Sequence, residues 1–399
     1  MSEEQSWGLF KRAADAEAPE APKCDAEWIF RAANFQGGSA RIYYANPKMG
    51  LRRPVILSDG FNSGPTDFND FWQGLNEKDF AFATELRRRG HDLILLGYQE
   101  RSASILQNAE IATQCIMRAI AERVGGTPML VGGFSMGGLV TRYALAKMEQ
   151  QAIDHQTDTY LSFDSPHRGA WIPISLQALA HFVTIAPAMS KQINSTASRQ
   201  LLVRHIPDLS TPPREDPERT RFLSELAAVG GWPQRPRKLA VANGNGTGQG
   251  NGVRPGEKAL ECTKGGFKPT TLFTQSSANG ALVASLKGPL QTKEIRTSEL
   301  PEIDGAPGGT LESFGIAAAN LTIPALAMEA TAYHPEICFV PSISAVSIRD
   351  INAKNLNENI SKIGLQESDL DEFRCSSDNV AHSKMTEELG VWILDRLSR

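Results

Sequence analysis

Residues 129–140 read MLVGGFSMGGLV. The apolar start predicts a strand over residues 129–132, and apolar side chains at helical spacing predict a helix over residues 137–150. Between them, Ser135 is the centre of a Gly-x-Ser-x-Gly pattern. A serine on a sharp strand-to-helix turn has a strained backbone, and its hydroxyl is lifted clear of the sheet. Gly133 and Gly137 lack the side chains that would obstruct such a turn. The stretch therefore predicts Ser135 as a nucleophile.

The surrounding sequence alternates short β-rich runs with longer helical patterns. This alternation is typical of a mostly parallel sheet with crossover helices on its faces, so we expect an α/β fold. We expect strands over residues 41–46, 54–58, 91–96, 129–132, 159–163 and 238–242, a late strand over 338–348 and a hairpin within 270–287. We expect helices over residues 79–89, 104–124, 137–150 and 386–397.

The pattern changes after residue 171. Residues 172–235 contain apolar helical segments separated by proline-rich, charged stretches, which predicts a helical cap or lid inserted into the main domain. We expect residues 1–39 to be an N-terminal extension, and residues 40–171 and 236–399 to form the core domain. The apolar run from Leu176 to Ile185 fits a lid face that contacts acyl chains and an ordinary core helix equally well.

Composition limits the classes of protein that this chain can belong to. Of its 399 residues, 41% are hydrophobic and 22% charged, so most of the chain can fold around a core. The net charge of −4 provides no basic field, so we expect no nucleic-acid partner. We find no apolar run of about 18 residues, so we expect no transmembrane segment.

The cysteines and the first residues indicate a compartment. The five cysteines are widely spaced and include no CxxC pair, which fits a reducing environment better than a disulfide framework. Residues 1–22 contain no apolar signal-peptide segment. We therefore expect a cytoplasmic protein, of an oligomeric state that the sequence leaves open.

Two segments resemble a known family. Residues 133–143, GFSMGGLVTRY, are similar to the nucleophile segment of α/β-hydrolase lipases and their inositol-deacylase-like relatives. Residues 165–169, SPHRG, resemble the turn that follows the next strand in those lipases. The resemblance covers residues 54–170 and, loosely, the segment around His382. It implies the α/β-hydrolase fold and a lipase- or esterase-like serine hydrolase.

A serine hydroxyl needs a base that takes its proton. In this fold the base is a histidine in a loop after the last strand, before the final helix. His382 fits that position. His167 is the main competitor because it is near the expected active face, but it comes too early for the order serine, acid, histidine.

The acid that orients the histidine is less clearly marked. Asp164 follows the strand after the nucleophile strand, as in pancreatic-type lipases, which this arrangement resembles. The more usual position, one strand later, holds Asn243. We predict Asp164 as the acid, with Asp350 after the late strand as the alternative; in a non-catalytic role, Asp164 would cap the Ser165-Pro166 turn.

Two backbone amides should bind the oxyanion that forms during acyl transfer. One belongs to Met136, the residue after the nucleophile. The other should come from the loop after residues 54–58, where Phe61 is the candidate. Lipases usually have His-Gly in this loop and this chain has Asp59-Gly60, which also suits a simple turn.

Nothing in the sequence indicates a cofactor or a metal. The alternating glycines of residues 244–252 match neither the P-loop nor the dinucleotide-binding pattern, and a flexible loop is the simpler interpretation. The HExxH motif and carboxylate-rich calcium loops do not occur.

These residues predict cleavage of carboxylic esters through an acyl-enzyme, on a small-molecule or lipid-like acyl substrate. A thioesterase, an amidase and an acyltransferase or cyclase would use the same residues, so they stay open. A non-catalytic binding module with this fold is the alternative outside enzymes.

Overall fold

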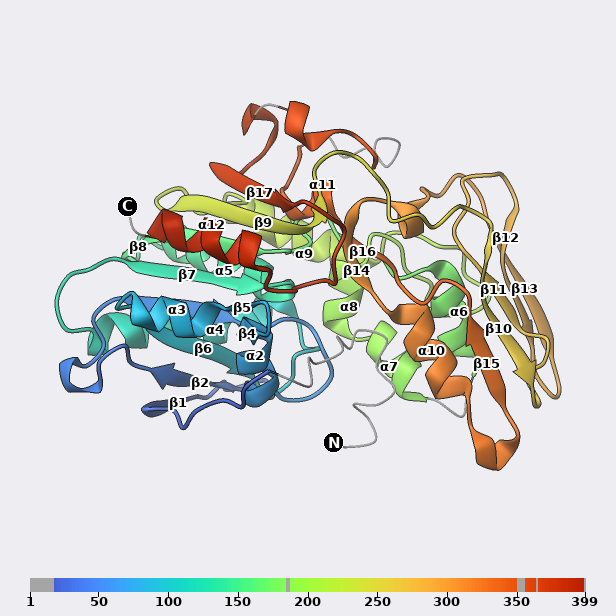
Figure 1. The fold of residues 1–399 in the computed structure, drawn as a ribbon, viewed down its shortest axis with the longest axis horizontal. Coiled ribbons are helices and arrows are strands. Elements are labelled where there is room, and N and C mark those ends of the chain that lie inside the picture. The colour runs from blue at the N-terminus through green and yellow to red at the C-terminus, as the bar shows by residue number, and fades with distance from the viewer. Residues whose placement is uncertain (1–17, 184–186, 350–355, 364, 398–399) are drawn as a thin grey trace.

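The computed structural model describes residues 18–183, 187–349, 356–363 and 365–397. Its largest element is an eight-stranded sheet with the strand order β1-β2-β6-β3-β7-β8-β9-β17 (Figure 1). The first two pairings, β1 with β2 and β2 with β6, are antiparallel, and the other pairings are parallel. The strands are β1 (Ala26–Phe30), β2 (Gly38–Tyr43), β3 (Pro54–Ser58), β6 (Asp92–Tyr98), β7 (Met129–Phe134), β8 (Thr157–Phe163), β9 (Arg237–Asn245) and β17 (Glu372–Ser376).

Counted along the chain within this sheet alone, the strands run in the order 1-2-4-3-5-6-7-8. The one reversal lies where β6 is placed between β2 and β3. A mostly parallel sheet in this order, with helices on both faces, has the α/β-hydrolase fold. β7, which ends just before Ser135, is the fifth strand in this count.

Helices cover both faces of the sheet because alternate strand residues point to opposite sides. Val55 and Leu57 pack in one hydrophobic cluster and Ile56 in another. The first cluster includes side chains of α2 (Phe68–Leu75), α3 (Phe82–Arg88) and α12 (Glu387–Leu397), and Figure 1 shows α3 and α12 across the near face. The second cluster includes side chains of α4 (Ile105–Glu122) and α5 (Met136–Gln150). A short hairpin, β4 (Asn76–Glu77) and β5 (Phe80–Ala81), lies between α2 and α3.

Two long insertions extend the sheet's carboxyl end. The first, between β8 and β9, holds α6 (Ile174–Phe182), α7 (Pro187–Ile193), α8 (Thr196–Leu201) and α9 (Pro217–Ala228). The second, between β9 and β17, holds a five-stranded antiparallel sheet in the order β13-β12-β11-β10-β15, at the right of Figure 1. Its strands are β10 (Lys258–Lys264), β11 (Thr271–Phe273), β12 (Ala281–Lys287), β13 (Thr292–Thr297) and β15 (Glu329–Ala332).

The second insertion also contains a small two-stranded sheet and two helices. β14 (Gly308–Leu311) pairs with β16 (Ile337–Pro341), and the helices are α10 (Ser313–Leu321) and α11 (Ser342–Ala345). Single 3₁₀ turns occur at Pro47–Met49, Ile303–Gly305, Pro324–Leu326, Ile360–Lys362 and Leu365–Glu367.

The two insertions pack against each other. All residues of α6 except His181 are buried, and the helix contacts β11, β12 and α10, so in this structure it behaves as a core helix. Asp304, in the second insertion, links it to the first. Its carboxylate accepts hydrogen bonds from the Trp171 indole of the first insertion at 2.6 Å and from the Gln275 backbone N–H at 2.7 Å. Burial raises the pKa of Asp304 to about 6, and these two bonds oppose that shift.

The structure differs from the expected organisation at both ends. β1 lies within residues 1–39, so this range contributes a strand to the main sheet. The expected late strand over 338–348 is β16, which ends at Pro341 and pairs with β14 outside the main sheet. The last main-sheet strand is β17, an edge strand that is only partly buried and alternates charged with apolar residues, so it has no continuous apolar run. The division into core and cap stays a prediction.

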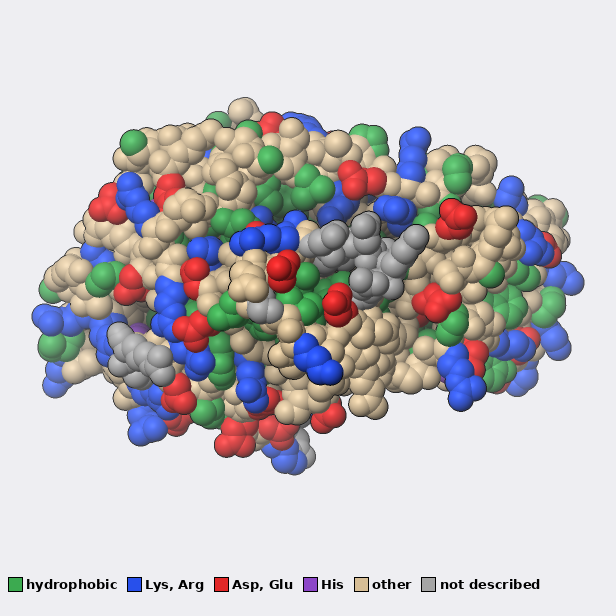
Figure 2. All heavy atoms as spheres, turned by 90° about the horizontal axis from the view of Figure 1, so that it is seen from above, with side chains coloured by type: hydrophobic (Ala, Val, Ile, Leu, Met, Phe, Trp, Pro, Cys, Tyr) green, Lys and Arg blue, Asp and Glu red, His purple; other side chains and the backbone are tan. Residues whose placement is uncertain are grey.

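On the face shown in Figure 2, Lys and Arg side chains are interspersed with Asp and Glu, and hydrophobic side chains gather near the middle. Within the described residues, no helix combines the length and apolar character that a membrane span requires.

Candidate active site

Ser135 lies on the turn between β7 and α5, with φ 52° and ψ −124°. This positive φ is strained for a side-chain-bearing residue. The Ser135 N–H donates to the Phe163 carbonyl at 2.9 Å, which holds the turn against the end of β8. A Cβ at Gly133 would lie 2.4 Å from the Gly137 carbonyl carbon, and one at Gly137 would lie 2.4 Å from the Ser58 carbonyl oxygen. The glycines are therefore required by close backbone approach, as the sequence predicts.

His382 lies beside Ser135 in the folded chain. Its Nε2 is 2.7 Å from Ser135 Oγ, and its Nδ1 is 2.6 Å from Asp164 Oδ2. All three residues are buried. An ionised carboxylate only accepts hydrogen bonds, so a neutral imidazole carries its proton on Nδ1. This N–H donates a hydrogen bond to Asp164. Nε2 is then the acceptor for the Ser135 hydroxyl.

Asp164 is fixed on several sides. It has φ 47°, and its N–H donates to the Val241 carbonyl at 2.8 Å. Its Oδ1 accepts the Asn243 N–H at 3.0 Å, while Oδ2 is bonded to His382. Both carboxylate oxygens are engaged, so the group that faces the imidazole cannot rotate freely. The alternative acid, Asp350, lies outside the described residues.

The loop that carries His382 is held by backbone hydrogen bonds to the second insertion. The His382 N–H donates to the Thr310 carbonyl at 2.8 Å, and the Thr310 N–H donates to the Val380 carbonyl at 3.0 Å. Thr310 belongs to β14. The Phe339 ring on β16 packs edge-on against the imidazole, with ring centres 4.8 Å apart.

Asn243 binds both Asp164 and the loop that carries His382. Besides its bond to Asp164, its carbonyl accepts the Val380 N–H at 2.9 Å, and its side-chain amide donates to the Lys384 carbonyl at 2.8 Å. In the sequence Asn243 is visible only as an asparagine where an acid is usual, and nothing there predicts these bonds. Thr310 is not marked in the sequence either, because a backbone contact leaves no residue-type signal.

His167, the competing histidine, has its contacts elsewhere. Its Nε2 is 2.7 Å from Ser162 Oγ, its Nδ1 is 3.3 Å from an Arg142 guanidinium nitrogen, and its ring packs on Trp232. Burial, with the positive charge of Arg142, lowers the pKa of His167 well below 6.5. This neutral, buried histidine stabilises the SPHRG turn rather than bonding to Ser135.

The loop after β3 lies directly against Ser135. A Cβ at Gly60 would be only 3.1 Å from Ser135 Cβ, so a larger residue at this position would crowd Ser135. The Asp59 carboxylate shapes the loop by accepting from the Gly60 N–H at 2.7 Å and from Thr66 Oγ1 at 2.8 Å. Asp59-Gly60 thus forms a turn, and that turn precedes the predicted oxyanion donor Phe61. The other predicted donor, Met136, is the first residue of α5.

Within the part of the chain that the structure describes, no group of three or more His, Cys, Asp or Glu side chains is arranged to hold a metal ion. The five cysteines are unpaired.

No protein-family model and no curated protein sequence matches the chain. Among solved structures, the chain is similar to the mature Bacillus licheniformis lipase BlEst2, at 11% identity and a TM-score of 0.33 over 55% of this chain and 73% of that one. It is similar to Est1E from Butyrivibrio proteoclasticus, at 11% identity and a TM-score of 0.32 over 54% of this chain and 76% of that one. These likenesses are too distant to support a function, and the fold described above rests on the strand order.

Proposed function

We propose that this protein is a serine hydrolase that cleaves carboxylic esters through an acyl-enzyme intermediate. The observation that supports this most directly is that His382 makes two short hydrogen bonds, one to Ser135 and one to Asp164. His382 Nε2 lies 2.7 Å from Ser135 Oγ, and His382 Nδ1 lies 2.6 Å from Asp164 Oδ2. A hydroxyl, an imidazole and a carboxylate in this sequence of contacts are what nucleophilic catalysis by serine requires.

In the first half-reaction Ser135 Oγ forms a bond to the ester carbonyl carbon. Its proton passes to His382 Nε2, and the carbonyl π electrons move onto the oxygen. The backbone amides of Met136 and Phe61 donate hydrogen bonds to that oxyanion. Asp164 keeps the Nδ1 proton of His382 in place and stabilises the imidazolium.

The oxyanion then collapses and the bond to the alcohol oxygen breaks. The leaving alkoxide takes the proton from His382 Nε2, so an alcohol departs and Ser135 remains acylated. In the second half-reaction a water molecule gives its proton to His382 and attacks the acyl carbon. The acid leaves, and Ser135 regains its proton.

The substrate class follows from the same residues and from the sequence resemblance to lipases. We infer an acyl ester, small or lipid-like, with an apolar acyl group. Thioesters and amides would form the same acyl-enzyme, so the leaving group has to be established by product analysis with matched ester, thioester and amide probes.

The proposal is tested with a p-nitrophenyl ester of a short acyl chain. We expect wild-type turnover, and a loss of at least about a thousandfold in Ser135→Ala, because the nucleophile is removed while the fold is retained. Ser210→Ala is the matched control, since its hydroxyl bonds the exposed Asp208. A Ser135→Ala protein as active as Ser210→Ala would refute the proposal.

A further inference from the structure

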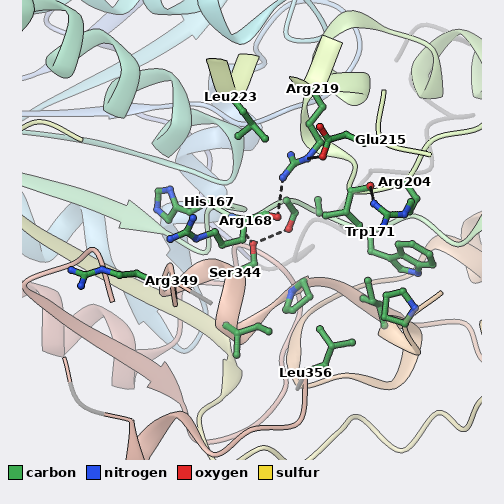
Figure 3. Close-up of a pocket in the computed structure, with 17 residues that line it drawn as sticks. His167, Arg168, Trp171, Arg204, Glu215, Arg219, Leu223, Ser344, Arg349 and Leu356 are labelled. Carbon is green, nitrogen blue, oxygen red and sulfur yellow. Dashed lines mark hydrogen bonds and ion pairs between the residues drawn. The ribbon is translucent and has the colours of Figure 1, made fainter. Parts of the chain in front are cut away.

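A cavity of about 380 Å³ lies beside the turn that follows β8 (Figure 3). It is bounded by residues of that turn, by the start of α9 and by α11. Ser135, Asp164 and His382 are not among the described residues that line it. The cavity is therefore distinct from the candidate active site, and its size is within the range of about 300–1,000 Å³ that small-molecule sites show.

Much of the cavity wall is apolar. Aliphatic side chains from the first insertion, the second insertion and α11 contribute to it, together with the Trp171 ring: Val203, Leu223, Pro301, Ile303, Pro341, Ile343 and Leu356. Leu223 projects into the space from α9 in Figure 3. Such a wall favours an occupant with an apolar body, because both surfaces leave water on binding.

The polar part of the lining is strongly basic. Arg168, Arg204, Arg219 and Arg349 line the cavity, and Glu215 is the one acidic residue among the described lining residues. Asp369 pairs with both Arg168, at 2.7 Å, and Arg349, at 3.2 Å. Among the described residues, four guanidinium groups line the cavity, and the carboxylates that line it or pair with them are Glu215 and Asp369, so the described lining is predominantly basic around an apolar space.

One of the four arginines, Arg219, has a structural role. Arg219 is buried and donates to the carbonyls of Arg168, Gln200 and Leu201, so it holds the wall together. Burial lowers the pKa of Arg219 to about 10; the nearby carboxylate of Glu215 opposes this shift, and the like charges of Arg204 and Arg168 add to it.

Arg168 has an unused donor. Its Nη2 is bonded to Asp369 Oδ2, but its buried Nε has no hydrogen-bond partner among the described residues. The Arg168 side chain as a whole keeps 33% of its surface exposed, so its guanidinium can donate to an anion in the cavity that it lines. The neighbouring His167 is neutral and buried, so it does not add to the charge that an anion would meet.

From this lining we propose that the cavity binds an organic anion that has an oxyanion head group, carboxylate or phosphate, on an apolar body. The head group accepts hydrogen bonds from Arg168, and the body contacts the aliphatic wall that includes Leu223. The inference concerns binding at a second site, so it stands whether or not the protein cleaves esters.

The test is calorimetric titration of the full-length protein with octanoate and octyl phosphate, and with octanol and inorganic phosphate as partial ligands. We expect at least one of the two amphiphilic anions to bind at least about tenfold more tightly than octanol and inorganic phosphate. Octanol lacks the anionic head group, and inorganic phosphate lacks the apolar body. Of the two anions, the one that binds more tightly identifies the head group. Octanol binding as tightly as both anions, or no binding of either anion, would overturn the proposal.

Variants locate the binding. Arg168→Gln should lower the affinity for the preferred anion by about tenfold. Leu223→Trp should weaken its binding by narrowing the cavity beside the apolar wall, and this variant tests the site even if Arg168→Gln does not fold. Arg88→Gln is the matched control, since Arg88 is an exposed residue of α3 paired with Glu85. Equal affinity in Leu223→Trp and Arg88→Gln would place the ligand elsewhere and contradict the inference.

Discussion

Ser135 and Asp164 both adopt a positive φ, at 52° and 47°. Each conformation carries a cost that neighbouring contacts must offset, and backbone hydrogen bonds to Phe163 and Val241 hold the two residues in place. The result is that a hydroxyl and a carboxylate reach the same imidazole from two adjacent strand ends. Local strain at these residues coincides with the atoms that we propose to react.

The choice of acid is tested at this scale by Asp164→Asn and Asp350→Asn, assayed side by side on a small ester. Asparagine tolerates a positive φ, so the first variant should fold. Its amide no longer fixes the Nδ1 proton of His382 or stabilises the imidazolium, and kcat should fall by about a thousandfold or more. Asp350→Asn should retain wild-type kcat. A drop in Asp350→Asn alone would contradict the assignment of Asp164.

Single residues differ in how far the sequence predicts them. Ser135 is marked by its glycine neighbours, and His382 by its place before the final helix. The position of Asp164 after the strand that follows β7 was a weaker signal, because a carboxylate there also suits a turn. Asn243 could not be predicted as a support for the His382 loop, since its bonds to Val380 and Lys384 appear only when β9 and that loop meet.

At the scale of elements, the strand β7 and the helix α5 approach each other and β3 closely enough to exclude side chains at the turn. Gly137→Ala tests this packing. Its Cβ would lie 2.4 Å from the Ser58 carbonyl oxygen and 2.5 Å from that of Asp59, so the backbone of β3 would have to move. We expect the free energy of unfolding in urea to fall by about 1–3 kcal/mol or more, and ester turnover to fall with it.

Gly126→Ala is the matched control for that substitution. A Cβ at Gly126 meets nothing within 4 Å, so the free energy of unfolding should stay within about 0.5 kcal/mol of wild type, as for most surface changes. If both alanine variants unfolded at the same urea concentration, close packing at the turn would not explain the glycine.

Elements marked by a continuous apolar run or by apolar residues at helical spacing are predicted well. The strand expected over residues 54–58 is β3 (Pro54–Ser58), and the helix expected over 104–124 is α4 (Ile105–Glu122). β17 was missed because an edge strand needs few apolar residues. The glycines near residue 248 were interpreted as a flexible loop, but a Cβ at Gly248 or Gly250 would lie 2.3 Å from a backbone oxygen, so close packing explains these two glycines.

At the scale of the whole molecule, the proposed catalytic residues are far apart in the chain. His382 lies 247 residues after Ser135 and 218 after Asp164. The second insertion is needed to bring them together, because Thr310 of β14 binds the backbone on both sides of Ala381. The sequence alone predicted six of the eight main-sheet strands, but neither β1 nor β17, and not that residues between β9 and β17 would hold the histidine loop. Reactivity of Ser135 should therefore depend on the intact fold.

The most direct test of the central claim is labelling with a fluorophosphonate, followed by mass spectrometry of the peptides. We predict that the folded wild-type protein is modified at Ser135, and that labelling is lost in Ser135→Ala and in urea above the unfolding transition, where His382 no longer reaches the hydroxyl. Folded protein that takes up no label at Ser135, or labelling of Ser135 that persists after unfolding, would contradict the account.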